Sequence, residues 1–429
     1  MVIYLLTTIN EDDINYKKWL EKETKNGIVI MDTATYKKII PSNFIETINI
    51  IITPTYEKDI ISICDFKTTY MYTSFIECIQ NIYHLKKYIY VIGNSELSKD
   101  CLWNGWIQTC KFYDMDNMES LSIFTFITEN YIKIKNNVYN YINREENNFI
   151  KLIQRINSDG MYKPSRCVPI KSLFGEKLCF SLKNNTFPLI TTKKTNLKLV
   201  YEELMFFLSG KTDTTILEKK KINIWKPNTS REFLDSRGLY HYPIGDMGPS
   251  YSFQFRHFGD TYHTCKETYK NGCDQLSNVV QLLKHDPFNR RIIINLWNAN
   301  DIDKMALPPC GLLYHFLVSE NGELFTILYQ RSSDILLAGA WNIASVSLFT
   351  ILLAHTTGLK PGGITWFLGD VHIYENQLDE LKQYLLVEPT IFPKLYIQQK
   401  RNNICDYLYE DIKLINYNPH PFFKVTFNT

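Results

Sequence analysis

The sequence lacks the cysteine patterns of metal-binding and disulfide-stabilised proteins. Its ten cysteines are scattered over 429 residues and include no C-x-x-C pair and no cysteine–histidine cluster at zinc spacing. We therefore expect free thiols in a reducing compartment and no metal site.

The sequence also lacks the features of exported, membrane and general nucleic-acid-binding proteins. The start, MVIYLLTTINEDD, has no basic region and too short an apolar run for a signal peptide. No segment is expected to approach a membrane span, and the formal net charge of +2 gives no strong cationic excess. We expect a cytoplasmic protein, in the host cytoplasm if the source is viral, that binds neither membrane nor nucleic acid.

The length favours two domains, and the pattern of apolar residues changes along the chain. In residues 1–127, short β-branched runs at 27–31, 48–53 and 88–93 alternate with amphipathic segments. This alternation is typical of an α/β domain with a parallel sheet. The polar stretch 128–147, rich in Asn and Lys, is the expected linker.

Residues 148–429 have the pattern of an α+β domain with a large buried sheet. A helix is expected at its start, and another ends near Gly210. SLFGEKLCFSL, residues 172–182, alternates like a pair of strands, and a long apolar helix is expected from about Trp341 to His355. Four segments carry the candidate site residues: NRRII (289–293), ALPPCG (306–311), QRSSDILLAGAWNIA (330–344) and GDVHIYENQ (369–377).

Each segment has an ordinary structural explanation when it is taken alone. Adjacent arginines are usually a solvated surface, an asparagine at a helix start is usually a cap, and a lone cysteine is most often a small core residue. Residue types alone therefore favour a structural role for Cys310 over a catalytic one.

The order and spacing of the four segments, however, closely resemble thymidylate synthase. The resemblance covers about residues 146–429 and includes FPLITTKK (187–194), DPFNRRIIINLWN (286–298), PKLYI (393–397) and YNPHP (417–421). It implies the α+β thymidylate synthase fold and conversion of dUMP to dTMP. The co-substrate it implies is methylene-tetrahydrofolate, which supplies both the carbon and the reducing equivalents.

The resemblance assigns the covalent chemistry to Cys310. Uracil C5 is a poor nucleophile, and addition of a thiolate to C6 activates it. A thiol of ordinary pKa is mostly protonated at neutral pH, so the nucleophile needs a cationic neighbour. Arg331 matches the family arginine that lies beside the cysteine and the phosphate, and Ser332 matches a phosphate-contacting hydroxyl.

The resemblance also assigns the remaining contacts. Arg290 and Arg291 match arginines that reach across a dimer interface, which implies an obligatory homodimer with shared sites. The uracil edge would be read by Asn342, and the ribose would be bound by His372 and Tyr374. Four further residues match proton-transfer and folate positions: Glu203 and Tyr251 for proton transfer near O4 and C5, and Asp334 and Trp225 for the folate.

The sequence departs from the family at several positions. Gly311 stands where the family usually has histidine, AGAW (338–341) replaces a glycine-leucine-proline-phenylalanine run, and Asn228 replaces a second tryptophan. Arg166 is one residue out of register with a phosphate-binding arginine, and Gln377 replaces a histidine. These changes leave two alternatives open: a dUMP hydroxymethylase, or a pseudoenzyme that binds nucleotide without turnover.

The first half faintly resembles the dihydrofolate reductase domain of bifunctional members of this family, in residues 18–39 and 88–102. Its functional positions fit poorly. Tyr16 falls near the position of the family's active-site acid. Thr33 falls at the position of an arginine that contacts the cofactor, and Thr47 near that of an arginine that holds the folate glutamate. Asn94 replaces the second glycine of the pair that approaches the cofactor pyrophosphate. The first strand is expected to be nearly absent. We expect a reductase-like domain without catalysis or NADPH use; the alternative is an unrelated α/β domain.

Overall fold

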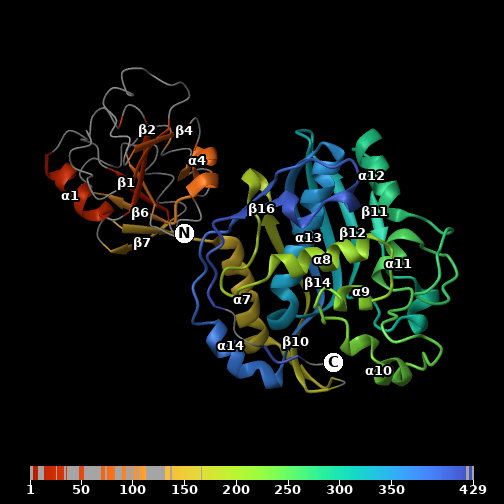
Figure 1. Ribbon diagram of the computed structural model, residues 1–429. Helices are drawn as coiled ribbons and strands as arrows, with labels where there is room; N and C mark the ends of the chain where they lie inside the picture. Colours follow the sequence, from red (N-terminus) through yellow and green to blue (C-terminus); the bar gives the residue numbers. More distant parts are fainter. Residues whose placement is uncertain are drawn as a thin grey trace. The chain divides into compact units, whose positions relative to one another are not determined.

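The computed structural model divides the chain into two compact units. Unit 1 is formed by residues 1–144, 389–393 and 415–418, and unit 2 by residues 145–388, 394–414 and 419–429 (Figure 1). The structure describes residues 3–7, 14–25, 27–32, 35, 48–52, 69–72, 75–82, 89–92, 97, 101–102, 104, 106–112, 131–135, 138–165, 167–421 and 425–427.

Unit 1 is built on one sheet, which among the described residues has the strand order β4-β3-β2-β5-β1-β6-β8-β7. The pairs from β4 to β6 are parallel, as expected for an α/β domain, and β8 and β7 add an antiparallel edge. The elements are β1 Ile3–Thr7, α1 Ile14–Thr24, β2 Ile28–Asp32, β3 Ile48–Ile52, β4 Thr69–Tyr72, α4 Phe75–Ile82, β5 Ile89–Ile92, β6 Thr109–Phe112, β7 Tyr131–Lys135 and β8 Val138–Tyr141.

Two expectations for the first half differ from this sheet. The prediction of a nearly absent first strand is wrong, because β1 lies between β5 and β6. The stretch 128–147, expected as a linker, contains β7, β8 and the start of a helix, and the two units divide at Arg144. The backbone of Tyr16 lies in α1, whereas Thr33, Thr47, Asn94 and Arg166 lie outside the described residues.

Unit 2 contains a mixed sheet with the strand order β11-β12-β13-β14-β10-β9. Only the pair β13–β14 is parallel within this sheet as described. This confirms the predicted α+β class. The strands are β9 Met161–Lys163, β10 Ile170–Ser181, β11 Ile293–Asn295, β12 Gly311–Val318, β13 Glu323–Asp334 and β14 Lys360–Tyr374, and a separate pair is β15 Lys394–Ile397 with β16 Ile412–Ile415.

Helices and short 3-10 turns connect and cover this sheet. α13, the longest, packs against β13, β14 and α8 (Figure 1). The helices are α7 Arg144–Asp159, α8 Leu197–Leu208, α9 Thr215–Glu218, α10 Arg231–Ser236, α11 Tyr251–Arg256, α12 Gln275–His285, α13 Ile335–Thr357 and α14 Leu378–Tyr384. The 3-10 turns are η4 Lys183–Asn185, η5 Pro227–Thr229, η6 Ala299–Lys304, η7 Glu375–Gln377, η8 Ile404–Asp406 and η9 Tyr409–Asp411.

The predicted strand pair at 172–182 is instead the single strand β10, which pairs with β14 along its whole length. Gly175 has φ of +85°, and the ladder skips it and its opposite residue, Gly369. A Cβ on Gly369 would lie 2.7 Å from the backbone oxygen of Arg331, so glycine lets β14 approach β13 closely here. A further register shift in β12 follows Gly311. These irregularities gather in adjacent strands beside the candidate site.

α13 begins earlier than the predicted 341–355. The side chain of Asp334 caps it by accepting from the backbone N–H of Leu337, and Gly358 ends it with φ of +77°. The helix is long and apolar enough to cross a membrane by length and composition, so the expectation that no segment approaches such a span is wrong. However, 72% of its most apolar window is buried inside unit 2. We conclude that it is the core helix on which the sheet packs.

Candidate active site

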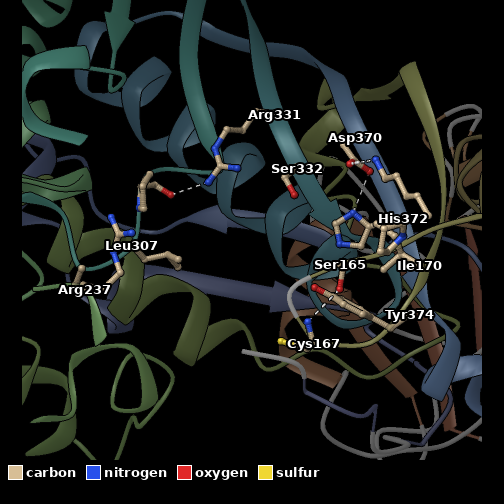
Figure 2. A pocket seen from close by; sticks show the side chains of 14 residues that line it. Ser165, Cys167, Ile170, Arg237, Leu307, Arg331, Ser332, Asp370, His372 and Tyr374 are labelled. Atoms are coloured by element: carbon tan, nitrogen blue, oxygen red, sulfur yellow. Dashed lines mark hydrogen bonds and ion pairs between the residues drawn. The ribbon is translucent and has the colours of Figure 1, made fainter. Parts of the chain in front are cut away.

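Unit 2 contains a cavity of about 490 Å³ at the end of the sheet where β13 and β14 carry polar side chains (Figure 2). Four of the residues assigned to the nucleotide line it: Arg331 and Ser332 from β13, and His372 and Tyr374 from β14. The structure thus brings together the phosphate-contacting and ribose-contacting residues that the resemblance implied. Other lining residues come from the stretch before β10, from the C-terminal end of α10 and from the segment that leads to Cys310.

The part of the cavity lined by His372 and Tyr374 is fixed by an ionic network. The carboxylate of Asp370 contacts Nζ of Lys163 and lies 3.2 Å from Nδ1 of His372 (Figure 2). Burial alone would raise the pKa of Asp370, but the hydrogen bonds with His372 and Lys163 hold it at about 2. The ring of His372 also packs edge-on against Tyr374, with the centroids 5.2 Å apart. The two side chains that the resemblance assigns to the ribose are therefore held in place within unit 2.

Cys310 and Arg331 are joined through backbone and side chain. The backbone N–H of Arg331 donates to the carbonyl of Cys310 at 2.8 Å, and its guanidinium donates to the carbonyls of Pro308 and Pro309. This leaves Nη2 of Arg331 3.9 Å from Sγ of Cys310, while the guanidinium lies over the ring of Trp297. A fixed cation beside a sulfur favours the thiolate, which is the reactive form.

Tyr251 connects Cys310 to an aromatic cluster. The backbone N–H of Cys310 donates to the hydroxyl of Tyr251 at 2.7 Å. The tyrosine ring stacks on Phe207 at 4.7 Å, and Trp225 packs edge-on against it at 5.9 Å. Burial raises the pKa of Tyr251 well above its ordinary value, and the neighbouring Cys310 adds to this shift. Tyr251 therefore keeps its proton at neutral pH.

Glu203, on α8, lies behind this cluster and is bound by two indoles. Nε1 of Trp225 donates to Oε1 at 2.9 Å, and Nε1 of Trp341 donates to Oε2 at 2.6 Å. Burial raises the pKa of Glu203, and the two indole hydrogen bonds oppose that shift. Of the proton-transfer residues of the resemblance, Tyr251 thus contacts Cys310 directly, and Glu203 is linked to Tyr251 through Trp225.

Asn342, assigned to the base, and Asp334, assigned to the folate, lie in and directly before the first turns of α13, whereas Trp225, also assigned to the folate, lies just before η5. The side chain of Asn342 makes no hydrogen bond within the part of the chain that the structure describes, so its amide is available to a bound molecule. Asp334 accepts from the backbone N–H of Leu337 and from Nε2 of Gln377, at 3.0 and 2.8 Å. Gln377 is fully buried and also donates to the carbonyl of Thr426. The substituted Gln377 therefore orients Asp334 directly.

Arg290 and Arg291 do not reach the cavity of their own chain. Both are exposed in the turn between α12 and β11, and neither lines the cavity. Their placement is compatible with the expected contribution to a second copy, which stays a prediction.

Gly311 sits at the register shift in β12, directly after Cys310. A Cβ added there would lie 3.3 Å from Cδ1 of Leu328 and 4.0 Å from the hydroxyl of Tyr314. A histidine at this position would therefore require Leu328 to move. Desolvation raises the pKa of the half-buried Tyr314, and the nearby Glu203 adds to the rise.

Four residues at the site were not singled out by the sequence motifs. Lys163 and Asp370 form the ionic network, and Trp341 had been noted only as part of a substituted segment. Arg237, at the C-terminal end of α10, lines the cavity (Figure 2). Its Nε is buried and has no hydrogen-bond partner among the described residues. Asp370 could have been found from its spacing, because it precedes His372 by two residues in a strand and so shares its face. Nothing in the sequence marks Arg237.

Comparison with known proteins gives a consistent result for this part of the chain. The family model for thymidylate synthase matches residues 147–429. Thymidylate synthase 1/2 of Encephalitozoon cuniculi is 43% identical over 65% of this chain and 96% of its own length. Thymidylate synthase of Saccharomyces cerevisiae is 42% identical, with 65% and 95% covered.

A bifunctional relative matches the same share of this chain. Bifunctional dihydrofolate reductase-thymidylate synthase of Leishmania major is 45% identical over 66% of this chain. The match covers 55% of that protein, so the chain is aligned to about half the length of this relative.

Proposed function

This chain belongs to the thymidylate synthase family, and we propose that unit 2 converts dUMP to dTMP through a covalent bond between Cys310 and uracil C6. The observation that carries the proposal is the fixed position of Arg331, whose Nη2 lies 3.9 Å from Sγ of Cys310 at the edge of a cavity suited to a nucleotide. Nucleophile activation and phosphate binding would then share one cation.

The first step would be addition of the Cys310 thiolate to C6. This addition places negative charge on O4 and makes C5 nucleophilic, so that C5 forms a bond to the one-carbon unit. Asn342 would hold N3–H and O4, because a carboxamide can accept from one and donate to the other. His372 and Tyr374 would bind the ribose hydroxyl, and Arg331 and Ser332 the phosphate.

The later steps need proton transfers at C5 and O4. We assign these to Tyr251, which accepts from the backbone N–H of Cys310, and to Glu203, which is connected to Tyr251 through Trp225. Loss of the C5 proton would let the bond between the one-carbon unit and the folate nitrogen break, so that the folate leaves and an exocyclic methylene remains on C5. Hydride addition to that methylene would re-form the C5–C6 double bond and return the C6–S bonding electrons to sulfur, which releases the Cys310 thiolate and leaves dTMP and dihydrofolate.

Methylene-tetrahydrofolate, the co-substrate that the family uses, supplies the carbon and the hydride when bound. Asp334 would hold the pterin ring. Each of its oxygens accepts one hydrogen bond in the structure, and a carboxylate oxygen has a second lone pair for a bound donor. Trp225 would pack beside the reacting carbon.

The active unit would be a homodimer. Arg290 and Arg291 are exposed and away from their own cavity, so we propose that they bind the phosphate held by a second copy. We further propose that unit 1 is a reductase-like domain without reductase activity and without NADPH. An assay of NADPH oxidation with dihydrofolate tests this, and robust turnover would contradict it.

The proposed reaction is tested by product analysis. The chain is incubated with dUMP and methylene-tetrahydrofolate, and the nucleotide product is identified by mass spectrometry. dTMP together with dihydrofolate is the expected result. Hydroxymethyl-dUMP would instead show a hydroxymethylase, and unchanged dUMP would show a protein that binds nucleotide without turnover.

A further inference from the structure

The two indoles on Glu203 come from different parts of unit 2. Trp225 lies just before η5, whereas Trp341 lies in α13, immediately before the uracil-reading Asn342. Each indole donates to a different oxygen of the carboxylate, at 2.9 and 2.6 Å. Because both oxygens are bound, the Glu203 carboxylate cannot rotate without losing a hydrogen bond.

Tryptophan is an unusually selective partner for a carboxylate. Its Nε1 can only donate, so it stabilises the ionised carboxylate and offers nothing to the proton of a neutral acid. Hydrogen bonds to an ionised acceptor are roughly twice as strong as neutral ones. The contact from Trp341 is the shorter of the two, and it is the larger of the two indole effects that lower the pKa of Glu203.

The sequence shows where this second indole comes from. Compared with the family pattern, Asn228 stands in place of a tryptophan, and Trp341 stands in place of the phenylalanine of the glycine-leucine-proline-phenylalanine run. Asn228 is buried and its side chain makes no hydrogen bond among the described residues. One tryptophan has thus been lost from the loop and one gained on α13.

We propose that Trp341 is a positioning residue for Glu203, which ties the proton-transfer carboxylate to the helix that carries Asn342. This inference rests on the proposed function, because Trp341 acts on Glu203, to which the proposed reaction assigns proton transfer. A movement of the part of α13 that carries Trp341 and Asn342 would then change the pKa of Glu203 as well as the contact between Asn342 and uracil.

Two variants at one position separate hydrogen bonding from packing. Trp341→Phe keeps an aromatic ring, and it is the residue type of the family pattern, but it removes the donor. Trp341→Gln removes the ring and retains an N–H donor. Circular dichroism and thermal melting confirm that each variant is folded.

The first measurement is the pH profile of turnover, with KM for dUMP determined at each pH. In Trp341→Phe we expect kcat to fall about tenfold near neutral pH, because a hydrogen bond to a charged group is lost. The acid limb should move up by about one pH unit, since the ionised form of Glu203 has lost a donor. KM for dUMP should stay within about twofold, and Trp341→Gln should keep its acid limb near that of the wild type.

The second measurement needs no turnover. Protonation of Glu203 changes the surroundings of the Trp225 indole, so tryptophan fluorescence is titrated with pH in the wild type, in Trp341→Phe and in Glu203→Gln. We expect a transition that Glu203→Gln lacks and that Trp341→Phe shifts to higher pH. A folded Trp341→Phe with the wild-type profile in both measurements would overturn the inference. If the wild type forms no dTMP, but the fluorescence transition still moves to higher pH in Trp341→Phe, only the proposed function is overturned.

Discussion

At the scale of single residues, the motifs marked the side chains that we propose to contact substrate but not the side chains that hold them in place. Asp370 shows this most clearly, because it joins Lys163 from the stretch before β10 to His372 on β14. The pair of Lys163 and Asp370 depends on side chains that are more than two hundred residues apart in the sequence. Spacing along the chain therefore could not predict the contact with Lys163, whereas the pair of Asp370 and His372 is local.

The depressed pKa of Asp370 predicts a pH-dependent stability. Its folded pKa of about 2 lies below its ordinary value of 3.8, so the ionised carboxylate stabilises the fold above the ordinary value and loses this effect as pH falls through the folded value. Asp370→Asn should lower the free energy of unfolding by roughly 1 kcal/mol at pH 7, allowing for solvent screening.

Urea denaturation between pH 8 and the acid range measures this effect. The difference between wild type and Asp370→Asn should be constant from about pH 8 to about pH 5 and shrink below about pH 4. Asp379→Asn is the matched control, because Asp379 is exposed and pairs only with Lys382 among the described residues, so we expect a change within about 0.5 kcal/mol. An equal loss in both variants would contradict the prediction.

At the scale of elements, apolar periodicity predicted the strands β2, β3 and β5 and the core helix α13. It predicted β10 as two strands, because Gly175 interrupts an alternating pattern as a turn would. Pairing with the equally long β14 keeps the strand continuous, and this long-range contact is not visible locally. The strands β7 and β8 were missed because their polar composition resembles a linker.

The segment FPLITTKK now has a structural explanation. Thr191 and Thr192 each donate their backbone N–H and hydroxyl to the carboxylate of Glu146, in the first turn of α7, at 2.8 Å in all four bonds. Burial raises the pKa of Glu146 to about 7 against the effect of these bonds. The four donors thereby fasten α7 to the segment.

Glu146→Ala should therefore destabilise unit 2 strongly. Four buried donors would lose their acceptor, which we expect to lower the free energy of unfolding by about 3 kcal/mol. Lys151→Ala, an exposed position on the same helix, should change it by less than about 0.5 kcal/mol in the same urea titration. Similar values for the two variants would show that the carboxylate does not anchor the helix.

At the scale of the whole molecule, the chain joins two units with separate sheets, and the proposed site lies within unit 2 and would be completed by a second copy. The sequence predicted the α+β and α/β classes of the two parts because each has its own apolar pattern. The positions of Trp341 and Arg237 at the site could not be predicted, because they result from packing between elements.

If each site takes residues from both copies, two different inactive variants should restore activity when they form a mixed dimer. Cys310→Ser and Arg291→Ala should each be inactive as pure dimers. Unfolding and refolding an equal mixture should restore roughly a quarter of wild-type activity, since half of the dimers are mixed and each mixed dimer has one intact site. A mixture that forms dimers by sedimentation but stays inactive would contradict a shared site.

The covalent role of Cys310 is tested most directly by release of tritium from dUMP labelled at C5, in the presence of methylene-tetrahydrofolate. The wild type should release tritium as it forms dTMP, because C5 loses its hydrogen only after sulfur has added to C6. Cys310→Ser should bind dUMP with little change, since Arg331, Ser332, His372 and Tyr374 remain, and should release no tritium. Undiminished release by a folded Cys310→Ser variant would contradict the account.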